Sequence, residues 1–314
     1  MSTISKILWR SSFASKLIVT MQLVKFGEKL NSPIVIALGF FGCMHKGHVQ
    51  LLEQAKKLAS QTDSKVALFT FSNNHLQVLG KNIKQLYTFN ERCKIYQNLG
   101  VDVLVTAEFD EKFKNTSGTN FLLTLSTYNL QGVVCGFDYT CGSDRQNCQF
   151  VCDYFKDIPV SVVDAVCKDG VKISTTFLRN LLANNDIERA NQMLSQPFFF
   201  DGVVVHGRGV GKNLGFPTAN LQVDDDKFLP EGVFAGNAIV GASSYRCIVN
   251  VGSKPTYDIA ERTIEVHIIN FDCNLYGTQL SINITKFLRP ICKFCDAEQL
   301  VQQLKIDREN CLND

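Results

Sequence analysis

Five short apolar segments recur in the first half of the chain, about 30 residues apart, and this repeat constrains the fold more than any other feature. The segments are Ile34–Leu38, Val66–Phe71, Val101–Thr106, Gly132–Gly136 and Val160–Asp164. Each is nearly continuously apolar, as in strands that are buried on both faces. Helix-compatible segments lie between them, including Val49–Ala59, Asn90–Leu99 and Asn120–Tyr128. This alternation predicts βα units and a parallel sheet.

The pattern changes after Ser174. The segment Thr176–Leu194 predicts two helices, and Asn185 with Glu188 three residues later resembles a capping box for the second one. Short strands then alternate with turns rich in Gly, Pro, Asn and Asp, at Val203–His206, Phe234–Val240, Tyr245–Val251, Thr263–Asn270 and Leu280–Phe287. These strands favour a small antiparallel β-barrel, on which a terminal helix at Ala297–Arg308 packs. We place the boundary near Asp186, which gives domains 1–186 and 187–314.

The composition is that of an ordinary globular protein with two domains. The chain has 314 residues, of which 45% are hydrophobic and 20% are charged. A formal net charge of +2 gives no support for nucleic acid or an anionic membrane as the main partner. No apolar run approaches the ~18 residues that span a bilayer. We therefore expect neither nucleic acid nor a membrane as a partner, and the oligomeric state stays open.

The 12 cysteines are scattered along the chain, so we expect reduced thiols and a cytoplasmic protein. Cys292 and Cys295 form one CxxC, but a zinc site needs a second pair of ligands at suitable spacing, which we do not find. Residues 1–27 contain basic residues and no acid. They form either an organelle transit peptide or a short basic extension before the first strand, and we favour the extension.

The first group of chemically suited residues follows the first predicted strand, in the segment GFFGCMHKGH from Gly39 to His48. His45 and His48 are three residues apart where a helix begins, so their side chains can converge. The free N–H groups and partial positive charge of a helix N-terminus suit a triphosphate. HxGH at this place in a parallel α/β domain resembles the signature of the nucleotidyltransferase superfamily, whose histidines bind ATP phosphates. The alternative is two histidines in a surface turn.

Two further segments support a phosphate site at the same sheet. ISTTFLR places three hydroxyls and Arg179 at the start of a helix, and GFDYTCG places Asp138 after the fourth strand, at the edge where open α/β sheets bind ligands. Each signal is weak by itself, because hydroxyls at a helix start are usually caps and an Asp after a strand is usually a turn residue. Their order along the chain is the stronger argument.

The second group lies in GVVVHGRGVGKNLGFPTAN, from Gly202 to Asn220. Its glycine-rich basic part, Gly207–Lys212, is the kind of loop that covers phosphates with backbone N–H groups. In GFPTAN, the Thr218 hydroxyl and the Asn220 amide oxygen are hard ligands suited to Mg²⁺ beside a nucleotide. Downstream, alternation in RTIEVHI puts Thr263, Glu265 and His267 on one strand face. Glu265 there is either a general base towards a hydroxyl or a solvated surface acid.

From about Val35 to Asp307 the chain resembles the bifunctional bacterial riboflavin kinase/FAD synthetase family. The segments that carry this resemblance in the second half are VVVHGRGVGKNLGFPTANL, GVFAG, NVGSKPT, RTIEVHI, NLYG and FLRP. The resemblance implies a Rossmann-like nucleotidyltransferase domain followed by a riboflavin kinase barrel. It implies that Thr218 and Asn220 hold Mg²⁺ and ATP, and that Glu265 deprotonates the 5′-hydroxyl of riboflavin. It places Arg289 on the flavin side, and His206 and His267 match no catalytic role.

The resemblance further implies that the first domain transfers AMP from ATP to FMN, giving FAD and pyrophosphate. Its catalytic residues would be His45 and His48, and Asp138 would bind the flavin. The implied ATP-binding residues of both domains are Gly39, Phe40, His45, His48, Ser174, Thr175, Thr176, Arg179, Gly207, Gly211, Lys212, Pro217, Thr218 and Asn220.

The chain departs from the family's usual pattern at two places. Gly42 and Cys43 replace Asp and Gly of GFFDGxHxGH, and TFSNNH replaces TF[DE]PHP. Three hypotheses follow: a bifunctional enzyme, a riboflavin kinase whose first domain is weakened or inactive, and a non-catalytic flavin-binding or regulatory protein. The complete GFPTAN segment and Glu265 argue against the third.

Overall fold

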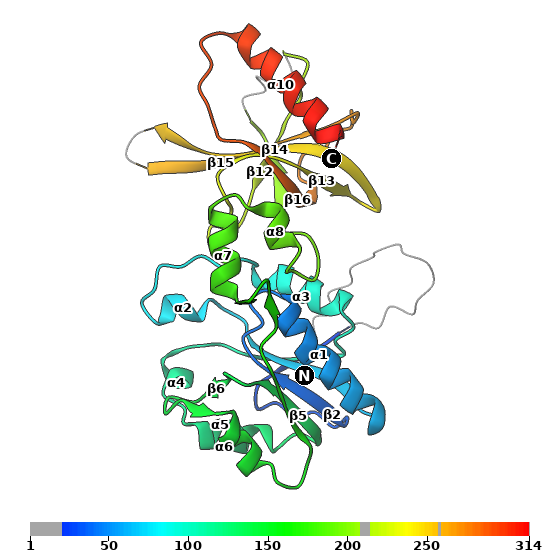
Figure 1. Cartoon of the computed structure of the whole chain (residues 1–314), viewed down its shortest axis with the longest axis vertical. Helices are drawn as coiled ribbons and strands as arrows, with labels where there is room; N and C mark the ends of the chain where they lie inside the picture. The colour runs from blue at the N-terminus through cyan, green and yellow to red at the C-terminus, as the bar shows by residue number, and fades with distance from the viewer. Residues whose placement is uncertain (1–20, 208–213, 257–258, 314) are drawn as a thin grey trace. The chain divides into compact units, whose positions relative to one another are not determined.

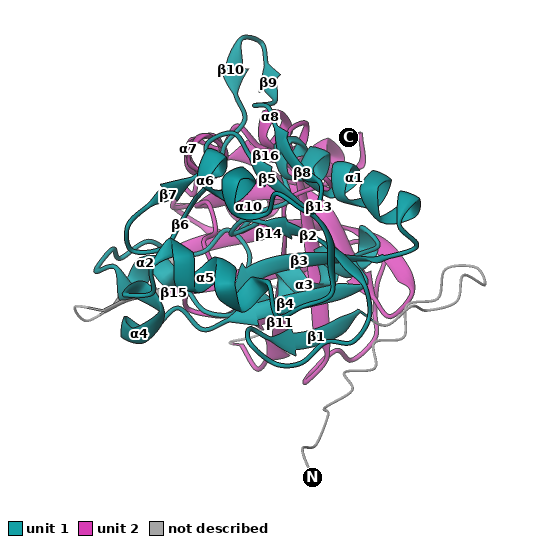
Figure 2. Ribbon diagram, turned by 90° about the horizontal axis from the view of Figure 1, so that it is seen from below, with its two compact units in different colours: residues 1–9, 14–175 teal, residues 10–13, 176–314 magenta. Residues whose placement is uncertain are grey.

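The computed structural model describes residues 21–207, 214–256 and 259–313, and the chain forms two compact units. Among the described residues, the first unit ends at Thr175 and the second begins at Thr176, as the two colours of Figure 2 show. The predicted domain boundary near Asp186 lies eleven residues after this division and stays a prediction, to be tested with fragments.

The first unit is built on a parallel sheet of six strands in the order β1-β4-β3-β2-β5-β8, of which Figure 1 labels β2 and β5 and Figure 2 labels all six. The strands are β1 (Gln22–Lys25), β2 (Ile34–Leu38), β3 (Lys65–Phe71), β4 (Val103–Ala107), β5 (Leu130–Gly136) and β8 (Val160–Val163). The five predicted strands and the parallel sheet are confirmed. The prediction that residues 1–27 are an extension before the first strand is wrong for residues 22–25. These residues form β1, which pairs in parallel with β4. Only Val24 of this edge strand is buried, and the strand follows directly on the apolar sequence LIVTM, which the sequence analysis did not assign to a strand.

Helices and two small hairpins complete the unit. The helices are α1 (Lys46–Gln61), α2 (His75–Val78), α3 (Phe89–Asn98), α4 (Glu111–Lys114), α5 (Gly118–Leu125) and α6 (Cys148–Tyr154). The hairpins are β6 (Thr140–Cys141) with β7 (Gln146–Asn147), and β9 (Cys167–Lys168) with β10 (Val171–Lys172). Strand residues that include Ile36, Phe69 and Val105 pack with Phe121, Leu122 and Leu125 of α5 into one core. The three predicted helices of this half are confirmed, with ends that differ by a few residues.

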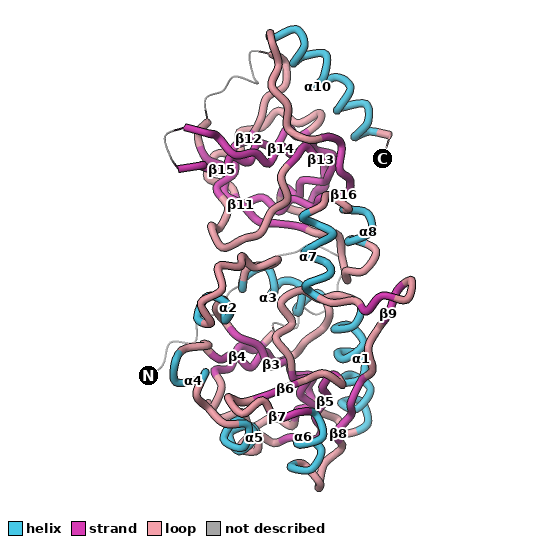
Figure 3. The backbone as a smooth tube through the Cα atoms, turned by 60° about the vertical axis from the view of Figure 1, so that its left-hand side comes forward, coloured by secondary structure: helices cyan, strands magenta, loops and turns pink. Residues whose placement is uncertain are grey.

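Two short helices, α7 (Thr175–Ala183) and α8 (Ile187–Asn191), precede the barrel (Figure 3). The break between them is confirmed, but the predicted capping box is wrong. The N-cap of α8 is Asp186, one residue after the predicted cap, and it makes no side-chain cap hydrogen bond. Asn185 instead has a left-handed backbone (φ 59°) that ends α7, and its amide donates to the Glu231 carbonyl at 3.1 Å. Asn tolerates this conformation better than most residues, which explains its place here.

The second unit is a closed six-stranded antiparallel barrel with the order β11-β12-β15-β14-β13-β16. Its elements are β11 (Phe199–Val205), β12 (Ala219–Gln222), β13 (Gly232–Val240), β14 (Ser243–Thr256), β15 (Ile259–Ile268), β16 (Gln279–Arg289) and the terminal helix α10 (Ala297–Leu312). Cys311 of α10 packs on Val233, Ala235, Ile248 and Ile269, on the outside of the barrel. The predicted barrel and terminal helix are confirmed. The sequence missed β12, which is formed by part of GFPTAN itself.

Among the described residues, no helix is both long enough and apolar enough to cross a membrane.

Candidate active sites

The two histidines of HKGH lie at the start of α1, as predicted. His45 is the N-cap, and its Nδ1 accepts a hydrogen bond from the backbone N–H of His48 at 3.2 Å. The two rings stack with centroids 3.7 Å apart. Nδ1 of His48 hydrogen-bonds to the carbonyl of Cys43. Because a carbonyl only accepts, this nitrogen carries the proton, and Nε2 of a neutral His48 has the lone pair.

Both histidines are neutral at pH 7 in this fold. Burial lowers the pKa of His45 to about 2, with a further contribution from the neighbouring His48, and burial lowers the pKa of His48 to about 4. A bound phosphate would oppose this effect, because a nearby negative charge favours the imidazolium form. The pair can therefore take up a proton when an anion enters the site.

This neutral pair predicts an acid-sensitive first unit. Between pH 6.5 and pH 4 the unfolded chain protonates both histidines while the folded chain keeps them neutral, so stability falls as pH falls. Each histidine contributes at most about 1.4 kcal/mol per pH unit. We expect amide exchange in α1 to accelerate between pH 6.5 and pH 5, after correction for intrinsic rates, and the His45→Gln/His48→Gln variant to lose most of this acceleration. Equal acceleration in both proteins would contradict the assignment.

A groove of about 230 Å³ brings five of the predicted residues together: His45, His48, Asp138, Ser174 and Thr175. It also contains Lys172, which the sequence analysis missed. The Lys172 ammonium pairs with the Asp138 carboxylate and lies 4.6 Å from the centre of the Phe137 ring. The hairpin of β9 and β10 carries this cation to the groove, and no local sequence pattern marks it. The Lys172 ammonium could therefore form an ion pair with a phosphate in the groove while it still contacts Asp138.

Thr176 and Arg179 follow Thr175 on α7 and belong to the second unit. The guanidinium of Arg179 lies 5.4 Å from the centre of the Phe228 ring in that unit. Their predicted contact with ATP stays a prediction.

The loop between β2 and α1 has an unusual backbone. Phe41 has φ 49°, a conformation that bulky residues rarely adopt. Its carbonyl accepts a hydrogen bond from the Tyr96 hydroxyl at 2.8 Å, and its buried ring packs on His48. Gly39 lies close to this ring, and an added Cβ would lie 3.1 Å from it, a tight contact. The turn that presents the histidines is thus held by a buried phenylalanine.

The Phe40 ring occupies the space that a side chain at Gly42 would need, and the family has Asp at this position. A Cβ at this position would lie 2.3 Å from the Phe40 ring. That ring packs on His75 with centroids 4.1 Å apart and lies 5.1 Å from the guanidinium carbon of Arg92. An acidic side chain at residue 42 would require the Phe40 ring to move. The observed position of this ring is therefore compatible with glycine at residue 42 and not with aspartate.

Arg92 links the two segments that depart from the family pattern. It is fully buried and donates to the Thr70 hydroxyl and to the Phe71 carbonyl, each at 2.9 Å. Thr70 in turn donates to the Phe40 carbonyl. Arg92 makes no ion pair with a carboxylate in the part of the chain that the structure describes. It fixes the Phe40 loop and the TFSNNH segment to the end of β3.

Cys43, His45 and His48 are the one described group of three side chains whose donor atoms approach one another within metal-binding range, all within 4.8 Å. The ring geometry does not fit a metal. The two imidazoles stack at 3.7 Å with an interplanar angle of 15°, and lone pairs in two nearly parallel planes cannot meet at one ion about 2 Å from each nitrogen. A phosphate, which accepts hydrogen bonds from separate directions, fits the pair better.

In the barrel, the strand register puts the predicted metal ligand and the predicted base side by side. Asn220 of β12 pairs with Glu265 of β15, and Glu265 pairs with Asn250 of β14. Paired residues of antiparallel strands point to the same face, with Cβ atoms about 5 Å apart. The inward neighbours Ile264 and Val266 are buried, so the alternation predicted for RTIEVHI is confirmed.

The same row continues across the barrel through Val233 to Arg289. Asn250 is a polar residue of this row that the sequence analysis did not select, because pairing across strands leaves no mark in the local sequence. Its Oδ1 is buried and has no hydrogen-bond partner among the described residues. Arg289 pairs with the buried Asp307 of α10, with Nη2 and Oδ2 2.9 Å apart. Its predicted place on the flavin side stays a prediction.

The remaining predicted kinase residues surround the start of β12. Thr218 and Pro217 come directly before this strand. Gly207 lies close to Asn220, and an added Cβ would lie 2.0 Å from the Asn220 amide, so any larger residue would require this side chain to move. Gly211 and Lys212 lie outside the described residues. The Asn220 side chain thus lies against the first residue of the glycine-rich loop.

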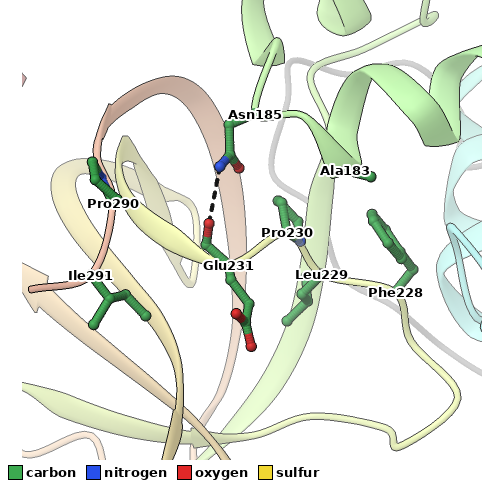
Figure 4. A pocket seen from close by; sticks show the side chains of 8 residues that line it. All are labelled: Ala183, Asn185, Phe228, Leu229, Pro230, Glu231, Pro290 and Ile291. Atoms are coloured by element: carbon green, nitrogen blue, oxygen red, sulfur yellow. Dashed lines mark hydrogen bonds between the residues drawn. The ribbon is translucent and has the colours of Figure 1, made fainter.

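The second unit also has a cavity of about 540 Å³ that none of the predicted site residues lines (Figure 4). Leu229, Pro230, Pro290 and Ile291 form most of its wall. Asn185 and Glu231 are joined there by their hydrogen bond, and Oδ1 of Asn185 has no partner among the described residues. Cys292, which follows Ile291, accepts a hydrogen bond from Arg289, and the CxxC joins no described group of three metal-ligating side chains.

Comparisons with known proteins cover both units. Residues 27–177 match the FAD synthetase family model, and residues 194–313 match the riboflavin kinase model. A bifunctional riboflavin kinase/FMN adenylyltransferase of Listeria monocytogenes is 32% identical over 88% of this chain and 90% of its own. The protein of the same name from Bacillus subtilis is also 32% identical, over 88% of this chain and 91% of its own.

A solved structure from Streptococcus pneumoniae, titled as a macrolide-efflux protein, superposes with a TM-score of 0.88. It is 29% identical and covers 94% of this chain and all of its own. The two family matches, in the same order as the two units of the structure, agree with the sequence patterns of both halves. The chain belongs to the bifunctional riboflavin kinase/FMN adenylyltransferase family.

Proposed function

We propose that the barrel unit phosphorylates riboflavin to FMN with MgATP, and that the α/β unit adenylylates FMN to FAD and releases pyrophosphate. The observation that carries the proposal is the pairing of Asn220 with Glu265, because these are the residues that we propose as metal ligand and as base. Phosphoryl transfer needs little else, since positioning and charge neutralisation provide most of the catalysis.

In the kinase site, the Thr218 hydroxyl and the Asn220 amide oxygen would hold Mg²⁺, and such oxygens are the ligands this ion prefers. The ion supplies neutralisation of phosphate charge. Glu265 takes the proton from the 5′-hydroxyl of riboflavin, whose oxygen attacks the γ-phosphorus of ATP while ADP leaves. Gly207, Gly211 and Lys212 bind the phosphates, Pro217 lies beside the nucleotide, and Arg289 lies towards the flavin.

In the adenylyltransferase site, an oxygen of the FMN phosphate attacks the α-phosphorus of ATP and pyrophosphate leaves. His45 and His48 bind and neutralise the departing phosphates, supported by the N-terminus of α1. Ser174, Thr175, Thr176 and Arg179 supply further donors to ATP, and Gly39 and Phe40 line its approach. Asp138, which shares a salt bridge with Lys172, binds the flavin substrate.

A second candidate function is that of a riboflavin kinase with a weakened first unit. The observation in its favour is the Phe40 ring, which fills the space that an acidic side chain at residue 42 would need. Incubation of the protein with riboflavin and MgATP, followed by chromatographic separation of riboflavin, FMN and FAD, distinguishes the two. FMN together with FAD supports the bifunctional enzyme. FMN alone supports the kinase, and neither product would overturn both in favour of a non-catalytic flavin-binding or regulatory protein.

Fragments test the proposed independence of the two units. We expect residues 176–314 and 187–314 both to fold and to phosphorylate riboflavin. The longer fragment keeps nearly all of α7, whose Leu178, Leu181 and Leu182 are buried, together with the hydrogen bond from Asn185 to Glu231, so we expect it to be the more stable of the two. Urea unfolding and kinase assays measure this. If only the longer fragment folds, the boundary moves from Asp186 to Thr176, and two inactive fragments would contradict independence.

A further inference from the structure

We infer that His267 is a positioning residue of the kinase site, which holds the GFPTAN segment so that the Thr218 hydroxyl faces the nucleotide. The inference rests on the proposed kinase function. It concerns a histidine that lies beside the reacting groups but has no chemical role in the mechanism above.

The contact that carries the inference joins two strands of the barrel. Nδ1 of His267 lies 2.8 Å from the carbonyl oxygen of Pro217. Because the carbonyl only accepts, Nδ1 carries a proton and donates it. The His267 ring also packs edge-on against Phe216, with centroids 5.4 Å apart. One side chain therefore holds both residues that precede Thr218.

The strand register explains why these contacts act on Thr218. Ala219 pairs with Val266 and Asn220 pairs with Glu265, so the next residues outward are Thr218 and His267. The ladder ends at Ala219, where β12 begins. Beyond this end, Pro217 has no backbone N–H with which to continue the pairing. The hydrogen bond from His267 to the Pro217 carbonyl connects the two strands beyond the last backbone pair. It thereby fixes the direction in which the chain enters β12.

The position of His267 on its strand makes this arrangement specific to the site. His267 and Glu265 are two residues apart, so their side chains leave the same face of β15. The predicted base and the support of the predicted metal ligand thus belong to one rigid strand. A metal ligand that is already held in place loses less conformational freedom when the nucleotide binds, so loss of this contact should appear mainly as weaker binding of MgATP. The contact between His267 and Pro217 therefore favours nucleotide binding by fixing the chain before Thr218.

The role of His267 as a positioning residue does not depend on its protonation state. Burial lowers the pKa of His267, and Arg308 adds to this effect, while the hydrogen bond to Pro217 opposes it. The Nδ1–H donor is present in both the neutral and the protonated ring, so the contact survives either form. A residue that acts in this way affects the binding of MgATP and leaves the pH profile of the kinase unchanged.

The test compares His267→Leu with His267→Asn in the full-length protein. Leucine removes the donor, and we expect the KM for MgATP to rise roughly tenfold with kcat changed by less than about threefold. Asparagine keeps a side-chain N–H near the position of Nδ1 and should recover at least half of the loss on a logarithmic scale. Titration calorimetry with MgADP should show the same order of affinities without turnover.

Thr263→Val is the matched control. Thr263 lies on the same face of β15, and its hydroxyl donates to the Gly252 carbonyl at 3.4 Å, on the side away from GFPTAN. This variant also loses one bond from a side chain to the backbone, and its KM for MgATP should stay within about twofold of wild type. An unchanged KM in His267→Leu, or an equal rise in Thr263→Val, would overturn the inference. A wild-type protein without kinase activity would instead overturn the proposed function.

Discussion

Glu265→Gln should lower the rate of FMN formation by roughly 10²–10⁴-fold, the range expected when a general base is lost. Glutamine keeps the size of the side chain and its place opposite Asn220 and Asn250, so the barrel should fold unchanged. The 5′-hydroxyl of riboflavin then has no carboxylate to accept its proton. The measurement is the initial rate of FMN formation with saturating MgATP, followed by chromatography.

The same protein provides the internal control. FAD formation from added FMN takes place in the other unit and should stay within about twofold of wild type. Glu309→Gln, at the exposed end of α10, removes one charge from the same unit and should leave both activities intact. Near-normal kinase activity in Glu265→Gln would remove Glu265 from the mechanism and leave the barrel with a binding role.

The central strands and the barrel could be predicted from the sequence because they form the core. Residues Ile34–Leu38 of β2 are almost completely buried, and a strand buried on both faces must be apolar throughout. Two strands do not follow this rule, β1 at the edge of the parallel sheet and the short β12 inside the closed barrel. In β1 only Val24 is buried, and β12 has four residues of which Leu221 alone is buried. Neither strand has the periodicity on which such a prediction depends.

The candidate sites could be predicted in part, where one short segment contains the chemistry. HKGH places both histidines in one turn, and GFPTAN contains both proposed metal ligands, so each was visible without the fold. Lys172 reaches its groove through a hairpin, and Asn250 reaches Glu265 through pairing between strands that are distant in sequence. His267 was visible in the sequence, but its role depends on a contact with Pro217, fifty residues earlier. Residues that depend on the register or on a distant loop need the three-dimensional structure.

His48→Ala should lower FAD formation by about 10²–10³-fold or more, the cost of removing one pre-aimed group that stabilises transition-state charge. Riboflavin phosphorylation should remain within about twofold of wild type, because the barrel unit contains the kinase residues. The helix should survive, since its N-cap is His45 and not His48. The measurement is FAD formed from FMN and ATP, with pyrophosphate release as a second readout.

The tautomer of His48 explains why no neutral side chain should replace it. Its Nδ1–H is already used by the Cys43 carbonyl, so Nε2 can donate to a phosphate only after it gains a proton. In the unliganded fold, burial keeps the pKa of His48 at about 4, and the phosphate charge must raise it. The active complex therefore contains an imidazolium, and FAD formation should decline as pH rises above the pKa of His48 in that complex.

His48→Gln can donate a hydrogen bond but cannot become charged, so it should recover little activity and lose this pH dependence. Full activity in His48→Gln would show that donation alone is sufficient and that the imidazolium is not required.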